Sequence, residues 1–308
     1  MATFPRVNPA PERHWLAGGG VFEPRNHIVD FTKATTTAPV VWRSDDPEYA
    51  GTGQATRAGC DMDSGRLGKV FRDGLESVRR YGWQDLGPYL FEVVSRRVHR
   101  AERTESFDAR FGTDTGEVVF PWQLPSLGAA RSAEIHAYEG TSASLVREIL
   151  SRLPVQTDQF AFVDLGSGKG RALLVASEFP FAEIVGVELS HELHLIAQEN
   201  VRRFRPAHQR ATTFCLSCMD ATQYDFGTKP LVLFLYNPFG RDTLRQVLTN
   251  LDASLEAAPR QAFLVYLNPR FESLLRTSSL ICAGRGGGWW RPWRHYVIYA
   301  ARSAGSGA

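Results

Sequence analysis

The sequence of 308 residues is short of three things: long hydrophobic runs, net charge and cysteine. No apolar run approaches the roughly 18 residues that a membrane-spanning helix needs. The first residues also lack the charged-then-apolar layout of a secretory signal. We therefore expect a cytoplasmic protein without a membrane partner. The net charge of +2 does not demand a polyanionic partner, so the composition gives no support to a nucleic acid as ligand.

The four cysteines do not form a metal-binding pattern. Cys215 and Cys218 make a lone C-x-x-C inside an apolar, strand-like segment, and neither Cys60 nor Cys282 supplies a second pair. A redox C-x-x-C opens a helix, whereas this one runs into the end of a strand. We predict buried strand thiols and no metal site.

Composition and periodicity divide the chain into three parts. Residues 1–60 are rich in Pro, Gly, Thr and Ala without sustained periodicity, which predicts an irregular arm. Residues 61–137 are predicted to form a helical cap or lid. Residues 138–303 contain strand-like and helix-like segments that we interpret as a doubly wound α/β sheet. The hydrophobic content of 43% is sufficient for the core of one large domain or two smaller ones.

Within the predicted cap, apolar residues follow helical spacing over residues 67–80 and again over roughly 88–103. The segment 107–138 is loop-like. A clean amphipathic helix then starts near Thr141 and leads directly into the first strand of the predicted sheet.

The most informative pattern is the run from Phe162 to Arg171. An apolar strand ends in an acid, and three alternating glycines then precede a helix-like pattern. Glycine lets the backbone approach a ligand closely, and a helix start offers free amide donors to an anionic group. We predict a loop that binds a nucleotide-type cofactor, although a tight connection without a ligand is the alternative.

Two other glycine-rich motifs do not match this sequence. A dinucleotide fingerprint needs a glycine where Arg171 stands, and a P-loop needs a glycine at Val163 and Ser or Thr at Gly170. The remaining pattern, acid-x-G-x-G-x-G at a strand-to-helix turn, resembles the first motif of the Rossmann-like S-adenosylmethionine (SAM) methyltransferases. This resemblance implies SAM as cofactor and S-adenosyl-L-homocysteine (SAH) as product. It also implies that the cofactor-binding residues include Asp164, Gly166, Gly168 and Gly170.

Two further predicted strands end in residues that suit the same cofactor. The strand 183–187 is followed by Glu188, about 20 residues beyond the glycine turn, where an acid can accept hydrogen bonds from ribose hydroxyls. The strand 213–218 is followed by Asp220 and Ala221, which the resemblance places beside the adenine. Each acid alone is equally compatible with a solvated strand end or a turn.

The apolar run 231–235 is typical of a central strand buried on both faces. It leads to Tyr236-Asn237-Pro238-Phe239, so four strand ends converge on the crevice where open α/β sheets bind ligands. The Asn237 carbonyl could orient an amine, and the Phe239 ring could stabilise a nearby cation. An ordinary turn after a buried strand is the alternative.

This last segment resembles two known motifs. One is the Asn/Asp-Pro-Pro-aromatic motif of amino-group methyltransferases, from which the second proline is missing here. The other is the Asn-Asn-Phe segment of the non-SET histone lysine methyltransferases, with Pro238 in place of the second Asn. The Asp-Leu-Gly-Ser-Gly turn and the Gly-Val-Glu strand end resemble that lysine family as well. The resemblance implies a catalytic role for Asn237 and Phe239, and cofactor contacts for Asn237.

The segment upstream of the sheet adds weaker candidates. Tyr138 and Thr141 occupy the place where related enzymes fold a loop over the cofactor, although Thr141 suits a helix cap equally well. Five residues near the motifs could serve as a general base, and the sequence selects none of them: His136, Tyr138, Glu139, His191 and His194.

The sequence therefore predicts a class I methyltransferase with a mostly parallel, seven-stranded Rossmann-like sheet. The expected reaction is transfer of a methyl group to nitrogen, with a protein lysine or a small molecule as the unidentified partner. Two alternatives stay open. One is a small-molecule O- or C-methyltransferase whose pocket is walled by Trp289, Trp290 and Trp293. For these tryptophans we favour a hairpin that packs onto the sheet, because aromatic residues are enriched in strands. The other is a non-catalytic SAM-fold binding domain. The oligomeric state is not predicted.

Overall fold

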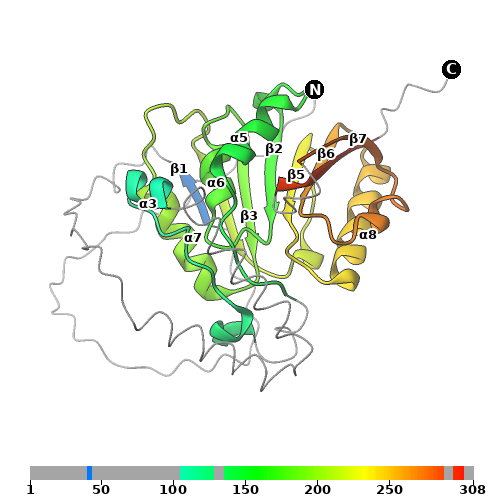
Figure 1. Ribbon diagram of the computed structural model, residues 1–308. Coiled ribbons are helices and arrows are strands. Elements are labelled where there is room, and N and C mark those ends of the chain that lie inside the picture. The colour runs from blue at the N-terminus through cyan, green and yellow to red at the C-terminus, as the bar shows by residue number, and fades with distance from the viewer. Residues whose placement is uncertain (1–39, 44–104, 128–134, 288–293, 302–308) are drawn as a thin grey trace, which may run out of the picture. The chain divides into compact units, whose positions relative to one another are not determined.

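The computed structural model describes residues 40–43, 105–127, 135–287 and 294–301 (Figure 1). Several predictions fall outside these residues: most of the arm, the helices at 67–80 and 88–103, and the tryptophan cluster. Val40–Arg43 lie within the predicted irregular arm and form a strand. None of the described helices is long and apolar enough to cross a bilayer.

Eight strands of the described chain form one sheet in the order β1-β4-β3-β2-β5-β6-β8-β7. The five strands from β4 to β6 in this order are parallel, whereas β1, β8 and β7 pair antiparallel with their neighbours. The seven predicted strands and their Rossmann-like arrangement are confirmed, and β1 adds an eighth strand at one edge. The strands are β1 Val40–Arg43, β2 Ala161–Leu165, β3 Glu183–Glu188, β4 Thr213–Cys218, β5 Leu231–Tyr236, β6 Ala262–Leu267, β7 Ile281–Gly286 and β8 Tyr296–Ala300.

The strand order reverses at β2. The chain moves outward from β2 through β3 to β4 and then returns to the other side of β2 as β5. The connections that leave β2 and β5 therefore separate, which opens a crevice at their carboxyl ends. This topology places the glycine turn after β2 and the Asn237 segment after β5 at one edge of the sheet.

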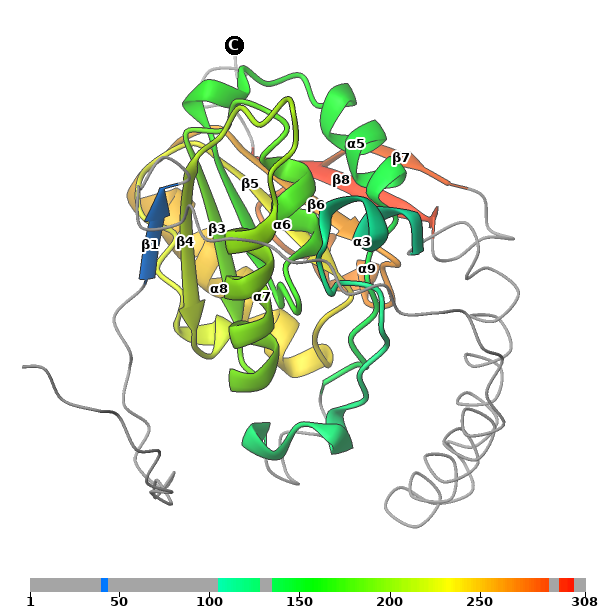
Figure 2. The ribbon, with the colours of Figure 1, turned by 90° about the vertical axis from the view of Figure 1, so that its left-hand side faces the viewer.

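Helices cover both faces of the sheet (Figures 1 and 2). One face packs against α5 Ala143–Arg152, α6 Arg171–Ala176 and α7 His191–Arg203, and the other against α8 Arg241–Ala257 and α9 Glu272–Leu275. Side chains of a strand alternate between faces, so in β2 Phe162 enters the first core while Val163 and Leu165 enter the second. The short 3-10 helices are η3 Pro121–Gln123, η4 Pro125–Leu127, η5 Thr157–Gln159 and η6 Ala221–Gln223.

The loop predicted for residues 107–138 is wrong at its start, where α3 Glu105–Phe111 forms. Two phenylalanines of α3 pack against Phe204 beyond the end of α7, with ring centroids 5.8 Å away for Phe107 and 4.6 Å for Phe111. A seven-residue helix has too few turns to show a periodic pattern. Its stability comes from this tertiary contact, which the local sequence does not reveal.

Residues 108–115, which we call the clamp segment, hold the glycine turn through two buried cations. Arg171 is 1% exposed; its Nε donates to Thr115 Oγ1 at 2.6 Å and its Nη2 lies 3.1 Å from Asp108 Oδ2. Lys169 is 2% exposed and its Nζ lies 2.8 Å from Asp114 Oδ1. Buried charges are tolerated only when they are paired in this way, so the clamp segment and the turn depend on each other.

Replacing Arg171 with methionine should lower the free energy of unfolding by about 3 kcal/mol, because Asp108 and Thr115 would lose their buried donor. Arg147→Met is the matched control. Arg147 pairs with Glu178 at a partly exposed site, and such pairs contribute about 1 kcal/mol or less. Chemical denaturation of both variants measures the two losses. Equal losses would contradict the role of burial.

Candidate cofactor and methyl-transfer site

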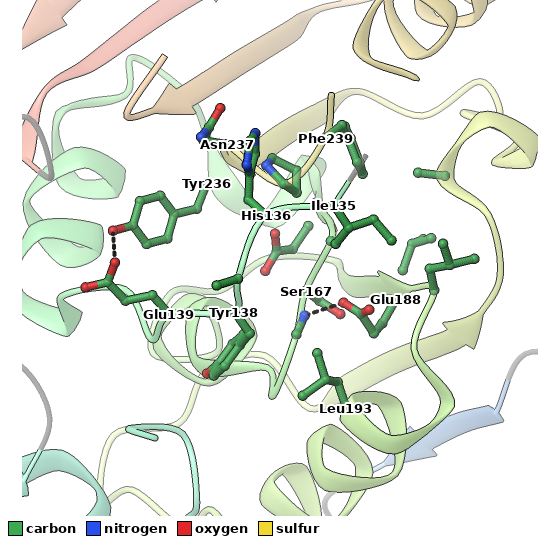
Figure 3. A pocket seen from close by; sticks show the side chains of 18 of the residues that line it. Ile135, His136, Tyr138, Glu139, Ser167, Glu188, Leu193, Tyr236, Asn237 and Phe239 are labelled. Atoms are coloured by element: carbon green, nitrogen blue, oxygen red, sulfur yellow. Dashed lines mark hydrogen bonds between the residues drawn. The ribbon is translucent and has the colours of Figure 1, made fainter. Parts of the chain in front are cut away.

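A cavity of about 310 Å³ lies at the carboxyl ends of β2, β3 and β5 (Figure 3). Residues around η4 and residues shortly before α5 close it from the other side, because Leu124, Leu127, Ile135 and Tyr138 also line it. Almost all of the site residues predicted from the sequence border this cavity: Tyr138, Thr141, Asp164, Gly166, Gly168, Glu188, Asp220, Ala221, Asn237 and Phe239.

Gly170 is the exception. It does not border the cavity but precedes α6 with a φ of +84°, and a Cβ there would lie 3.3 Å from the Cβ of Ala197. The glycine is needed for the left-handed turn into the helix. Its predicted cofactor contact therefore has no counterpart in the lining of the cavity.

The other two glycines let neighbouring side chains lie directly on the turn. Gly166 and Gly168 have φ values of +80° and +55°. A Cβ on Gly166 would collide with Pro238, and a Cβ on Gly168 would collide with the ring of Tyr138. The turn thus touches the segment after β5 and the segment before α5 at the same time.

Glu188 at the end of β3 braces the turn. Its Oε2 accepts a hydrogen bond from the Gly168 N–H at 2.7 Å, and its Oε1 accepts one from the Ser190 N–H at 2.8 Å. A carboxylate has about four acceptor sites, so it retains capacity for the hydroxyls of a ligand. Glu188, the predicted ribose-binding residue, therefore also stabilises the glycine turn.

The floor of the cavity is rich in carboxyl oxygens. Burial raises the pKa of Asp164 well above its ordinary range, and the charge of Glu188 adds to the rise. Burial also raises the pKa of Glu188, against the backbone donors of Ser190 and Gly168. Two buried carboxyl groups of this kind favour a ligand that brings hydrogen-bond donors.

The segment before α5 crosses the glycine turn. Tyr138 pairs with Val119 through two backbone hydrogen bonds, and its hydroxyl donates to the Thr115 carbonyl at 2.8 Å. Burial raises the pKa of this phenol, so Tyr138 remains neutral and is occupied in holding the clamp segment. Ser142 caps α5, not Thr141.

Two hydroxyls at the cavity have no hydrogen-bond partner in the described structure. Thr141 Oγ1 and Ser167 Oγ are both buried, and both residues line the cavity. An unpaired buried hydroxyl costs about 1–3 kcal/mol. The arrangement therefore suits a polar ligand that would pair with them.

On the opposite wall, Asp220 caps η6. Its Oδ1 accepts hydrogen bonds from the Thr222 N–H at 2.9 Å and from Thr222 Oγ1 at 2.8 Å. Both the cap and the ligand-binding interpretations of Asp220 are compatible with this geometry, since its other oxygen, Oδ2, makes no hydrogen bond within the described residues. Ala221 is 6% exposed and lies beside it in the cavity wall.

Asn237 stands at the end of β5 in a left-handed conformation with a φ of +43°. It is 6% exposed, and its Oδ1 accepts a hydrogen bond at 3.0 Å from Tyr266, a buried residue of β6 whose pKa burial raises to about 12. Asn is among the few residues that tolerate this backbone region. The amide is thus fixed in orientation, with a second acceptor site on Oδ1 still available.

Of the five residues considered as a base, three line the cavity: His136, Tyr138 and Glu139. The Glu139 carboxylate accepts a hydrogen bond from the Tyr236 hydroxyl at 3.3 Å (Figure 3). His194 is directed at Gln198 on its own helix, and neither His191 nor His194 borders the cavity.

Residues 127–226 match the model of a family described as "Histone methylation protein DOT1". This part of the chain is similar to that family. The match contains the glycine turn, Glu188 and Asp220, and it ends before β5. No curated protein sequence matches the chain significantly.

Several solved structures resemble the chain at low identity. A ribosomal protein L11 methylase from Lactobacillus delbrueckii subsp. bulgaricus has 17% identity and a TM-score of 0.36, over 52% of this chain and 76% of that one. The magnesium protoporphyrin IX methyltransferase (ChlM) from Synechocystis PCC 6803 with bound SAM has 16% identity and a TM-score of 0.37, over 68% of this chain and 96% of that one. The glycopeptide N-methyltransferase MtfA complexed with SAM has 13% identity and a TM-score of 0.39, over 54% of this chain and 89% of that one.

The family match and the strand order confirm the class predicted from the sequence. The chain has the class I fold of the SAM-dependent methyltransferases, with a likeness to the histone lysine methyltransferases, and SAM is the cofactor of this class. The cavity fits SAM chemically. Thr141 Oγ1 and Ser167 Oγ offer unused polar groups, the glycine turn leaves the backbone accessible, and the carboxyl groups of Asp164 and Glu188 suit the amine and the ribose hydroxyls of SAM.

Sequence reasoning missed Ser167, because it occupies a variable position of the glycine motif and carries no signal of its own. It also did not single out Lys169, which is buried and paired with Asp114. The partner lies 55 residues earlier in the chain. No local pattern connects the two.

Gly168→Ala should disrupt the site more than its backbone conformation alone explains. Gly227 has the same φ of +55° but open space around it, so Gly227→Ala measures the cost of the left-handed conformation, about 1–2 kcal/mol. Gly168→Ala should cost a further 1–3 kcal/mol or so from overpacking against Tyr138, and it should weaken SAM binding. Thermal unfolding and calorimetry of both variants test this. Equal losses would show that Tyr138 adjusts freely.

Glu188→Ala should lower the affinity for SAM at least about 100-fold, since hydrogen bonds to a charged group contribute about 1.5–3 kcal/mol each. Glu183→Ala, at the other end of the same strand and paired with Lys229 at the surface, is the control and should leave binding unchanged. Calorimetry with SAM gives both values. Unchanged affinity in Glu188→Ala would contradict the cofactor assignment of this crevice.

Proposed function

We propose that this protein methylates nitrogen, in an amine or a protein lysine, and that Asn237 and Phe239 form the transfer site. The observation that carries the proposal is the fixed amide of Asn237 at the end of β5. Its carbonyl oxygen is oriented by Tyr266 and retains a free acceptor site. A neutral amine needs an acceptor for its N–H group more than it needs a base.

SAM, when bound, supplies a methyl group activated by a sulfonium. The residues of the chain mainly have to align the acceptor, because positioning can account for much of the acceleration in such a displacement. Asn237 Oδ1 would accept a hydrogen bond from the amine. With the amine held in this way, its lone pair would form the new C–N bond as the C–S bonding pair goes to sulfur, and the nitrogen would then release a proton to water.

The aromatic residue of the segment supports the same assignment. Phe239 lines the cavity and packs partly against the second core. Its backbone pairs with Ile135, which holds the ring in the wall. An aromatic face stabilises a nearby cation by about 0.5–2 kcal/mol, which suits the positive charge that the nitrogen acquires.

The family match supports the lysine form of this proposal, because the matched family is described as a histone methylation protein. It does so indirectly, since the match ends at residue 226 and Asn237 lies beyond it. The acceptor therefore has to be determined by the product of the reaction.

The decisive experiment is transfer of labelled methyl from SAM in host-cell extract, comparing the wild type with Asn237→Ala. The protein fraction is hydrolysed in acid and separated against standards of mono-, di- and trimethyllysine, and the small-molecule fraction is analysed in parallel. We expect label in N-methylated products with the wild type. With Asn237→Ala we expect at least about tenfold less, the effect of losing one hydrogen bond of 1.5 kcal/mol in the transition state.

Calorimetry with SAM is the control, and Asn237→Ala should retain binding within a few-fold of the wild type. Equal losses of binding and turnover would place Asn237 with the cofactor instead. Label confined to O- or C-methylated small molecules would refute the nitrogen assignment. Normal SAM binding without label, in extracts from several sources, would favour a binding domain.

A further inference from the structure

One polar atom at the cavity has no role in the site described above. It is Nε2 of His136, which is buried and has no hydrogen-bond partner in the described structure. The ring lines the cavity together with Asn237 and Phe239 (Figure 3). The other two unpaired atoms, on Thr141 and Ser167, belong to the segments around the glycine turn.

The backbone fixes His136 against the segment that follows β5. Ile135 and Phe239 form an antiparallel bridge, which sets His136 opposite Pro238 in the pairing. Pro238 itself rests on Gly166, where no Cβ could fit. His136 is therefore joined to the Asn237 segment, and through it to the glycine turn, by consecutive contacts.

The ring nitrogens have different roles. The imidazole is hydrogen-bonded to the backbone of Phe239, and this bond favours the protonated ring, as expected when a ring N–H donates to a carbonyl. Because Nε2 has no partner, the bonded nitrogen is Nδ1. A proton on Nδ1 leaves Nε2 of the neutral ring as a lone-pair acceptor.

The ring is neutral under ordinary conditions. Burial and, to a smaller degree, the positive charge of Arg270 lower the pKa of His136 to about 4, although the hydrogen bond with Phe239 acts in the opposite direction. An imidazole of this kind is a poor base toward an ammonium ion, whose pKa is about 10. It is well suited to accept a hydrogen bond without competing for the proton.

We infer that His136 Nε2 is the second hydrogen-bond acceptor for the methyl-accepting nitrogen, acting together with Asn237 Oδ1. This inference rests on the proposed function and narrows it to acceptors with two N–H groups. A neutral primary amine has two N–H groups and one lone pair. When the two side chains take both N–H groups, the lone pair is left in the remaining direction, available for the methyl group.

The same pair of acceptors discriminates against oxygen. A hydroxyl has one O–H and can satisfy only one of the two side chains, so the other acceptor stays buried and unpaired. Such an unpaired group costs about 1–3 kcal/mol, or about 5- to 150-fold in binding. The site therefore selects amines by hydrogen bonding, without a charged residue at the point of transfer.

The test measures transfer of labelled methyl from SAM into N-methylated products in host-cell extract, because the inference concerns the accepting nitrogen itself. The wild type, His136→Phe and His136→Gln are compared at equal protein concentration. Calorimetry with SAH on the same three proteins measures the cofactor site separately.

We expect His136→Phe to lower the rate of N-methylation about fivefold or more, the effect of losing one hydrogen bond to the accepting amine. His136→Gln, whose side-chain oxygen can accept in place of Nε2, should stay within about threefold of the wild type. SAH affinity should be unchanged in both. Wild-type N-methylation by His136→Phe would overturn the inference, as would equal losses in both variants.

A measurement on the wild type keeps the test valid if His136→Phe does not fold. Nitrogen-15 spectra of histidine-labelled protein in the SAH complex should show His136 Nε2 unprotonated. A protonated Nε2 would overturn the inference. Absence of N-methylated product with the wild type would instead refute the proposed function, whereas unchanged N-methylation by His136→Phe refutes only the role of His136.

Discussion

Close approach of side chains to the glycine turn is the constraint on which the site depends. Gly166 and Gly168 adopt left-handed conformations, and Pro238 and Tyr138 occupy the volumes that side chains on them would need. The segment after β5 and the segment before α5 therefore meet on one short turn. Without that contact the glycine turn would still line one side of the cavity, but the two segments would not enclose it.

Two independent sets of interactions hold the turn in this shape. From the sheet side, Glu188 accepts the Gly168 N–H. From the outer side, the clamp segment pairs with Lys169 and Arg171, and Asn200 of α7 donates to the carbonyls of both Asp114 and Lys169 at 2.9 Å. Because the two cations are buried, removal of their partners would cost more than it would at exposed pairs. The turn is consequently rigid before any ligand arrives.

The parts of the fold that were predicted from the sequence are those whose signal is local. Strand β4 was predicted with the observed bounds, because a short strand-like segment followed by turn residues marks a strand and its end. The glycine turn and Glu188 were found because their spacing is fixed by one βα unit. Strand β1 and helix α3 were not predicted, since both are stabilised by partners more than 90 residues away, β4 and Phe204.

The residues of the site differ in the same way: some were found from a local motif, and others only from their tertiary contacts. Asp164 and the glycines belong to a motif, whereas the roles of Ser167 and His136 depend on the residues that surround them in the fold. His136 was one of five possible bases in the sequence. Its unpaired Nε2 and its hydrogen bond with Phe239 single it out, and they also change the role from base to hydrogen-bond acceptor. A tertiary contact thus altered both the choice of residue and the chemistry expected of it.

The two halves of the cavity are built on different principles. The cofactor half, from β2 to β4, relies on backbone shape and on carboxyl groups that also brace the turn, so its residues cannot change without loosening the fold. The acceptor half relies on two neutral side chains, Asn237 and His136, mounted on a bridge between loops. Exchange of one of these neutral side chains leaves no buried charge unpaired, unlike exchange of Asp108 beside Arg171. The family match includes His136 but ends before Asn237, so the acceptor has to be identified from the residues around β5 rather than from the cofactor motif.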